Sequence, residues 1–257
     1  MSSFLDISNL DLSYDQGESY VLKSVNASLK KGQLTALIGK NGSGKSTLIN
    51  AIANQTSIAA GSIRIGGKEA AQIDIQEKSK ALSIVRTFLP DLGYMTVEEF
   101  VALGRYPYTN WSGKLDDKNI SKVEGVLKDM QISHMKSKYL FELSDGERQK
   151  TIIARSLAQD TSLILMDEPT AFIDPVASLE ILDLLKSQCV ENHKAILFSS
   201  HDIGSTFIYA DQIWLIDENN HLHRGKPMEL INNGQVEKAF GKEGYQLVQS
   251  IIGFQPI

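Results

Sequence analysis

One stretch of the chain, Gly-Lys-Asn-Gly-Ser-Gly-Lys-Ser-Thr at residues 39–47, constrains the fold more than any other. It fits the pattern G-x-x-x-x-G-K-[ST] of a phosphate-binding loop, in which glycines let successive backbone N–H groups point at one anion. The apolar residues 34–38 before it predict a buried strand, and residues 46–53 after it predict the first turns of a helix. Because a helix N-terminus adds the positive end of its dipole, this context predicts a site for a nucleotide phosphate.

The loop offers both backbone and side-chain groups to such a ligand. We expect Lys45 to reach the β- and γ-phosphates and the Ser46 hydroxyl to coordinate Mg²⁺. The alternative, a surface turn rich in Gly and Lys, is disfavoured by the strand and helix patterns on its two sides. The residues expected to contact the nucleotide are Gly39, Asn41, Gly42, Ser43, Gly44, Lys45, Ser46 and Thr47.

Length and composition limit the classes of function. The 257 residues suffice for one large α/β domain or a core with a subdomain, and the net charge of -5 argues against a general nucleic-acid binder. Cys189 is the only cysteine, which excludes an intrachain disulfide and a cysteine cluster for zinc. No signal-peptide pattern is present, and no run approaches the roughly 18 apolar residues of a membrane span. We therefore expect a cytoplasmic protein whose membrane role comes through a partner.

The apolar patterns divide the chain into an α/β part and a helical insertion. Alternation from Phe4 to Leu29 predicts short antiparallel strands joined by a polar turn at 15–18, and further strands are predicted at 62–65 and 82–85. A mostly helical segment from about 88 to 159 then interrupts this part. Its predicted helices begin at a capping box of Thr96 with Glu99, at Asn119 and at Ser144.

Strands and helices alternate again after this segment. Such alternation predicts a parallel, doubly wound sheet. The predicted elements lie at 163–166, 176–189, 195–199, 203–210 and 212–216.

Two strand ends carry side chains suited to phosphate chemistry. Asp167 and Glu168 follow the apolar run 163–166, so Asp167 is expected to face the Mg²⁺ shell and Glu168 to orient or deprotonate the attacking water. His201 follows the strand predicted at 195–199, where it could donate a hydrogen bond to the γ-phosphate or hold the water with Glu168. A lone histidine at a strand end is more often an ordinary polar residue, so its assignment depends on the other motifs.

A second helix start, in the run Leu143–Gln149, also suits an anion. One nucleotide cannot occupy two helix N-termini that lie far apart in one core, so a dimer in which this turn closes on the partner's ATP is the economical explanation. The alternative is a plain capped helix start, with Ser144 and Glu147 as a capping box, and it holds in either case.

With these motifs in this order, nearly the whole chain resembles an ATP-binding cassette (ABC) ATPase. Residues 39–47 match its Walker A motif, 163–168 its Walker B motif with the catalytic glutamate, and 143–147 its LSGGQ signature as LSDGE. Residues 171–174 resemble its D-loop and His201 its switch histidine. The resemblance implies ATP and Mg²⁺ as cofactors and ATP hydrolysis as the activity.

The resemblance also implies a fold and a set of roles. The fold is a P-loop (RecA-like) α/β core with an N-terminal antiparallel β-subdomain, at about 1–87 and 160–257, and an inserted helical subdomain at about 88–159. All of it, 1–257, is one ABC ATPase domain. The implied catalytic residues are Glu168, His201 and Lys45, and the implied metal ligands are Ser46 and Asp167. The further nucleotide contacts are Tyr14, which stacks on adenine, and Ser144, Gly146, Glu147 and Asp174.

Two positions depart from the family pattern. Thr87 stands where the family usually has a glutamine that links the metal to the membrane subunit, and its hydroxyl is shorter and carries no amide. Asp145 replaces the first signature glycine, and an acid beside a phosphate would repel it unless the side chain points away. Gly146 is retained.

The stretch 95–108 resembles ATPases of iron–siderophore, haem and cobalamin importers, in which V-x-x-x-x-A-L-G-R-Y-P is typical. Its arginine and aromatic residues, Arg105 and Tyr106, are expected to dock on a short helix of a membrane subunit. The implied partners are a second copy of the chain, integral membrane permease subunits and, indirectly, a substrate-binding protein, without nucleic acid. The implied location is peripheral, on the inner face of the cell membrane. Two alternatives stay open: a soluble ABC ATPase of iron–sulfur cluster assembly, and nucleotide-gated binding without turnover, which Glu168 and His201 disfavour.

Overall fold

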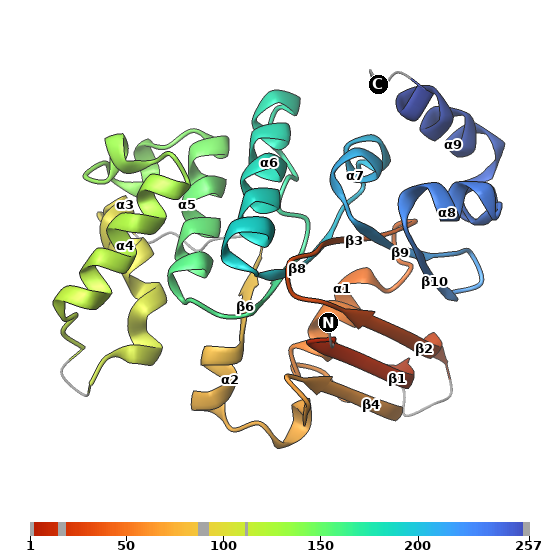
Figure 1. The fold of residues 1–257 in the computed structure, drawn as a ribbon, viewed down its shortest axis with the longest axis horizontal. Coiled ribbons are helices and arrows are strands. Elements are labelled where there is room, and N and C mark those ends of the chain that lie inside the picture. Colours follow the sequence, from red (N-terminus) through yellow and green to blue (C-terminus); the bar gives the residue numbers. More distant parts are fainter. Residues whose placement is uncertain (1–2, 15–18, 87–92, 111–112, 254–257) are drawn as a thin grey trace.

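The computed structural model describes residues 3–14, 19–86, 93–110 and 113–253. These residues form two β-sheets with helices between and beside them (Figure 1). The polar turn predicted at 15–18 and Thr87 lie outside the described residues.

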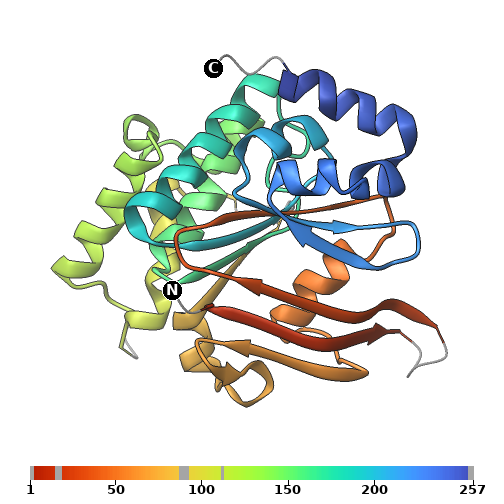
Figure 2. The ribbon, with the colours of Figure 1, turned by 45° about the vertical axis from the view of Figure 1, so that its right-hand side comes forward.

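The first sheet is antiparallel, as the alternating pattern of the N-terminal residues predicts, and it has four strands. Its order is β2 (Tyr20–Leu29), β1 (Leu5–Ser13), β4 (Ala60–Ile65) and β5 (Lys68–Glu69). Its apolar side chains pack on α1 (Lys45–Ile52), which lies between the two sheets (Figure 2). The helix that follows the phosphate-binding loop is therefore held on two sides by apolar contacts.

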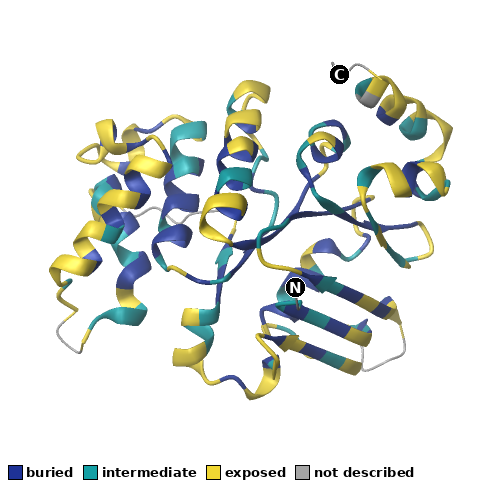
Figure 3. Ribbon diagram, in the orientation of Figure 1, coloured by how far each residue is buried: buried dark blue, intermediate teal, exposed yellow. Residues whose placement is uncertain are grey.

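The second sheet is six-stranded and carries the predicted parallel strands. Its order is β10 (Leu222–Gly225), β9 (Gln212–Ile216), β3 (Leu34–Gly39), β8 (Ala195–Ser199), β7 (Leu163–Met166) and β6 (Leu82–Val85). All neighbouring pairs are parallel except β9 with β10. Because β3, β7 and β8 are buried along their whole length, both faces of the sheet are covered, as parallel sheets require (Figure 3).

Three helices of the predicted insertion pack side by side: α3 (Val97–Ala102), α4 (Asp117–Asp129) and α5 (Asp145–Ala158). They lie to one side of the large sheet (Figure 1) and share its apolar core. Both predicted capping boxes are confirmed: Thr96 with Glu99 begins α3, and Ser144 with Glu147 begins α5.

The remaining helices complete the layers around the sheets. They are α2 (Ile75–Ala81), α6 (Pro175–Asn192), α7 (Ile203–Tyr209), α8 (Pro227–Asn232) and α9 (Gln235–Gly253). Single 3-10 turns lie at Ala70–Gln72, Leu103–Tyr108, Ser133–Met135 and Leu140–Glu142. In the part of the chain that the structure describes, no helix is long and apolar enough to cross a membrane.

The chain after Gly225, which contains no recognisable motif, forms α8 and α9. The helix α9 is interrupted at Gly241, whose φ of 75° is left-handed, and it packs against α7 and β9. Cys189 on α6 is fully buried in the core. Burial raises the pKa of its thiol to about 12, so this cysteine is neutral and unreactive at ordinary pH.

Candidate nucleotide-binding site

A cavity of about 480 Å³ opens where the carboxyl end of β3 meets the N-terminus of α1. This is a usual size for a small-molecule pocket. The structure thus brings the phosphate-binding loop together with residues from several distant segments. The lining residues are Tyr14, Val21, Asn41, Gly42, Gly44, Lys45, Ser46, Thr47, Glu168, His201 and Asn220.

Glycine is required at three positions of the loop for different structural reasons. Gly42 and Gly44 adopt left-handed φ angles of 78° and 97°, which glycine adopts without strain. At Gly44 a Cβ would also lie 2.7 Å from Cγ1 of Val21. At Gly39 a Cβ would lie 2.7 Å from Oγ of Ser43. Side chains at Gly39 and Gly44 would therefore force the loop out of its present curve.

Lys45 is buried and points back into the loop. Its Nζ donates hydrogen bonds to the carbonyl oxygens of Gly39 (3.0 Å) and Lys40 (3.2 Å). Burial lowers the pKa of this ammonium below its ordinary value, although the nearby carboxylates of Glu168 and Asp167 act in the opposite direction. A desolvated cation at this position attracts an anion more strongly than one in water.

The loop also contains a buried hydroxyl that fits a phosphate oxygen. The Oγ of Ser43 is buried and has no hydrogen-bond partner within the part of the chain that the structure describes. An unsatisfied buried hydroxyl costs stability unless a ligand or water supplies the partner. Together with the curved backbone and Lys45, this orphaned group indicates that the loop fits the phosphates of a nucleotide.

The two carboxylates after β7 are linked to the end of β8 by Ser199. The buried Ser199 hydroxyl donates to Oδ1 of Asp167 (2.7 Å) and accepts the backbone N–H of Glu168 (2.9 Å). Sequence reasoning missed this residue. The signal was available, because Ser199 is the last residue of a strand expected to lie parallel to the one that ends before Asp167.

Glu168 itself has an unusual backbone. Its φ of 52° is left-handed, which is uncommon for a residue with a Cβ and typical of functional sites that hold strain. Its carboxylate forms an ion pair with Nε2 of His201 when that ring is protonated. The structure therefore places the predicted general base and the predicted switch histidine in contact, at the wall of the cavity.

Tyr14 and the turn between β9 and β10 form the rim of the cavity. The ring of Tyr14 is exposed and its hydroxyl shares a hydrogen bond of 2.5 Å with Oγ1 of Thr47. Asn220, which sequence reasoning missed, comes from the turn that Lys40 contacts through Glu218 (3.2 Å). Its φ of 59° is left-handed, and no pattern in the sequence links this turn to the loop.

The other predicted contacts lie elsewhere. Among the described residues, the cavity lining includes neither the signature turn nor the D-loop aspartate. In the turn, the Ser144 N–H donates to Oε2 of Glu147 (2.9 Å), and the Ser144 hydroxyl accepts the N–H of Glu147 (3.3 Å). The hydrogen bond from the Ser144 N–H is the main cause that lowers the pKa of the Glu147 carboxyl. The hydrogen bonds of this turn are therefore those of a complete helix cap. Within a single copy of the chain, the turn does not contribute to the lining of the cavity.

The D-loop aspartate and the signature turn lie against each other. Asp174 accepts the N–H of Ala177 (3.0 Å) and caps α6. A Cβ built on Gly146 would lie 3.3 Å from Cβ of Ala177. The N-termini of α5 and α6 are therefore neighbours on the same surface, and both are exposed at Ser144 and Asp174. Asp145, the acid in place of the first signature glycine, is exposed in the first turn of α5.

The expected docking role of Arg105 is wrong. The side chain is buried rather than presented to a partner, with Nη1 donating to the Ala158 carbonyl (2.6 Å) and Nε to Oδ1 of Asn119 (2.7 Å). Its guanidinium also lies over the ring of Tyr108. Tyr106 is exposed, so this residue alone of the predicted pair faces solvent. The motif here stabilises the helical insertion from within.

The comparisons with known proteins agree with this geometry. The ABC transporter family model matches residues 22–171. The petrobactin import ATP-binding protein YclP of Bacillus subtilis is 32% identical over 92% of this chain and 92% of its own length. The hemin import ATP-binding protein HmuV of Pseudomonas entomophila is also 32% identical, over 92% of each chain.

Among solved structures, the dimeric cassette MJ0796 of a bacterial ABC transporter superimposes with a TM-score of 0.73 at 25% identity, over 87% of this chain and 98% of that one. The predicted fold class, a P-loop α/β core with an antiparallel β-subdomain and inserted helices, is thus confirmed. The chain belongs to the ABC transporter family and is one of its ATP-binding, ATP-hydrolysing subunits.

Proposed function

We propose that this chain powers the import of an iron–siderophore, haem or cobalamin-type metal complex. Relatives that match it over most of their length include import ATP-binding proteins for petrobactin, iron(3+)-hydroxamate and hemin. The stretch 95–108, with its exposed Tyr106, carries the same resemblance in the sequence. In this proposal the chain is cytoplasmic and peripheral to the inner face of the membrane, where it acts on permease subunits and, through them, on a substrate-binding protein.

The active unit in this proposal is a pair of chains with two shared nucleotides. One observation supports it: the predicted nucleotide contacts do not all lie at one cavity. The phosphate-binding loop lines the cavity, whereas the cavity lining does not include the predicted contacts Ser144, Gly146, Glu147 and Asp174. An exposed, capped turn at a helix N-terminus suits an anion presented by another molecule. ATP held by one copy would then be covered by the turn of the other.

The cavity residues divide the chemistry among them. Lys45 binds the β- and γ-phosphates, and Tyr14 stacks on the base. Glu168 accepts a proton from the attacking water, with His201 holding Glu168 or the γ-phosphate. Ser46 and Asp167 would hold Mg²⁺, which supplies charge neutralisation on the phosphates when bound. No cluster of three or more metal-binding side chains occurs among the described residues.

We further propose that the single domain 1–257 divides into a core at about 1–87 and 160–257 and a helical subdomain at about 88–159. In the closed pair, the helical subdomain of one chain carries its signature turn to the core of the other.

Reconstitution tests the import function. The tagged chain is purified from detergent-solubilised membranes, and the permease that accompanies it is incorporated with it into proteoliposomes that contain ATP. We expect ATP-dependent accumulation of at least one of four probes: a ferric hydroxamate, a ferric catecholate, haemin or a cobalamin. The same preparation with Glu168→Gln should accumulate none above background.

Two results would contradict this proposal. Association of the chain with a soluble scaffold and no polytopic membrane protein would favour iron–sulfur cluster assembly instead. Accumulation of the probes at the same rate without ATP would show that the chain does not power their transport.

A further inference from the structure

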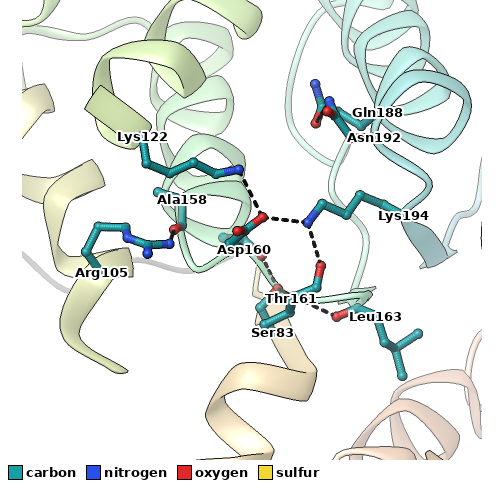
Figure 4. A network of polar contacts seen from close by, with 11 residues as sticks. Ser83, Arg105, Lys122, Ala158, Asp160, Thr161, Leu163, Gln188, Asn192 and Lys194 are labelled. Carbon is teal, nitrogen blue, oxygen red and sulfur yellow. Dashed lines mark hydrogen bonds and ion pairs between the residues drawn. The ribbon is translucent and has the colours of Figure 1, made fainter. Parts of the chain in front are cut away.

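A network of charged and polar groups surrounds the junction between α5 and β7 (Figure 4). At its centre the Asp160 carboxylate accepts hydrogen bonds from Nζ of Lys122 (3.0 Å) and Nζ of Lys194 (2.9 Å). Lys122 lies on α4 of the helical insertion, whereas Lys194 immediately precedes β8 of the core. One carboxylate therefore joins two parts of the molecule that are separated in the fold.

Further contacts hold the same junction from the helical side. The buried Arg105 donates to the carbonyl of Ala158, the last residue of α5, and to Asn119 of α4. On the core side, Nζ of Lys194 also donates to the Thr161 carbonyl (2.9 Å). Asp160 has a left-handed φ of 56°, which costs energy for a residue with a Cβ unless surrounding contacts hold it.

The core side continues into β6. The Ser83 hydroxyl contacts the hydroxyls of Ser156 (2.7 Å) and Thr161 (3.0 Å). Ser83, Leu163 and Ala195 lie at the amino ends of β6, β7 and β8. The network is thus at the opposite edge of the sheet from the nucleotide cavity, and the cavity lining includes none of its described residues.

The helix α5 connects this network to the signature turn. Its 14 residues correspond to a length of about 21 Å at 1.5 Å per residue. A tilt of about 10° at the Ala158 end would move Ser144 at the other end by about 4 Å, enough to break every hydrogen bond the turn could make to a phosphate. The angle of α5 at the junction therefore decides whether the turn can reach the partner's nucleotide.

We propose that Asp160 is a positioning residue for ATP hydrolysis: by joining Lys122 of α4 to Lys194 of the core, it fixes the tilt of α5 and so the place of the signature turn. This inference rests on the proposed shared site between two copies. Burial opposes the charge of Asp160, but the bonds from the two lysines outweigh burial and lower the pKa of its carboxyl. The carboxylate is therefore ionised at neutral pH and able to hold both lysines at once.

The test compares Asp160→Asn with a matched variant, Asp211→Asn. Asparagine tolerates the left-handed backbone of residue 160, so the substitution removes charge while keeping the shape. Asp211 is a half-buried aspartate whose side chain pairs with Lys186 of α6 and accepts the backbone N–H of Leu34, both in the core. For Asp160→Asn we expect unchanged ATP affinity of the single chain, and ATP-dependent dimerisation and kcat that fall about 2- to 30-fold, the range for residues in a coupled network. Asp211→Asn should lower thermal stability but leave ATP affinity, ATP-dependent dimerisation and kcat unchanged.

A distance measurement between α4 of the helical insertion and α6 of the core reports whether the junction holds the insertion in one position. Spin labels at Glu124→Cys on α4 and Glu191→Cys on α6, in a Cys189→Ala background, should show one narrow distance in the otherwise unchanged chain. The distribution should broaden in Asp160→Asn and in Lys122→Met, and stay narrow in Asp211→Asn. Lys122→Met tests the same network if Asp160→Asn fails to fold, because Lys122 lies on the surface of α4 and is only half-buried.

The outcomes separate the two proposals. Asp160→Asn with normal kcat and a narrow distance, or with a loss of stability alone, would overturn the positioning role. If the unsubstituted chain hydrolyses ATP without ever forming a dimer, the shared site itself fails, whatever Asp160 does. Loss of ATP affinity in Asp160→Asn would also contradict the inference, since the network lies at the far edge of the sheet.

Discussion

The two helix N-termini that are proposed to bind phosphate are built in opposite ways. The N-terminus of α1 faces a cavity, with a buried Lys45, an orphaned Ser43 hydroxyl and a backbone curved by left-handed glycines. The N-terminus of α5 is exposed, and Ser144 and Glu147 satisfy each other's hydrogen bonds. The first is incomplete without a ligand, whereas the second is stable as it stands.

In the proposed pair of chains, this difference explains how one copy could hold ATP without hydrolysing it. The α1 site holds unsatisfied polar and charged groups whose cost a nucleotide removes, so binding is a property of the single copy. The α5 turn gains only when another molecule brings a phosphate to it. Turnover then depends on association, and the two regions should respond differently to substitution.

The largest expected effect is at the cavity wall. Glu168→Gln keeps the size of the side chain but removes the base, so kcat should fall about 10²- to 10⁴-fold, as for loss of general base catalysis. ATP should still bind, and the closed pair should accumulate. Steady-state phosphate release and size-exclusion chromatography with ATP measure the two effects.

The control for Glu168→Gln is Glu218→Gln, an exposed carboxylate at the rim that pairs with Lys40. It should leave kcat within about two-fold, as surface pairs contribute little. If Glu168→Gln hydrolyses ATP at the rate of the unsubstituted chain, Glu168 is not the general base.

A smaller effect is expected at the loop. Lys45→Ala removes charge-assisted hydrogen bonds to phosphate, each worth about 1.5–3 kcal/mol, so the affinity of the single chain for ATP should fall about 10- to 150-fold. Titration calorimetry at concentrations below association measures it. Lys40→Ala removes a neighbouring lysine that lies exposed outside the cavity and should bind ATP normally. Equal affinities for both variants would mean that the α1 site is not the one that holds ATP.

The smallest effect concerns the two capping boxes. Ser144→Ala and Thr96→Ala each remove an N-cap, and each should lower the free energy of unfolding by about 0.5–2 kcal/mol. Only Ser144→Ala should also lower ATP-dependent dimerisation and kcat, because α3 has no predicted contact with nucleotide. Denaturant unfolding and phosphate release on both variants measure this. Similar kcat values for the two would leave the α5 turn as a helix cap and nothing more.

Local patterns predicted much of the fold because their causes are local. The capping boxes need residues three apart, the buried strands need short apolar runs, and the phosphate-binding loop needs glycines at fixed spacing. The chain after Gly225 was not predicted, since α8 and α9 carry no motif and gain their place only by packing on β10, α7 and β9.

Arg105 shows where local reasoning fails. Next to an aromatic residue and before a proline, it resembles an exposed docking residue. In the structure it is buried, because Asn119 and the Ala158 carbonyl, both remote in sequence, supply its partners. Asn220 was missed for the same reason, since it enters the site only because its turn lies beside the loop. Ser199 differs, because its place at the end of a predicted strand beside β7 could have been inferred.

By itself the sequence determined the phosphate-binding loop, the apolar strands, the helix starts and the identity of the acidic and basic groups suited to phosphate chemistry. Only the tertiary structure decided that Ser199 links Asp167 to Glu168, that Arg105 is buried, and that Asp160 joins the helices to the core. The physical reason is the range of the interactions. Helix caps and turns are set by neighbours a few residues apart, whereas strand order and buried ion pairs depend on segments far apart in the chain, whose association no local pattern encodes.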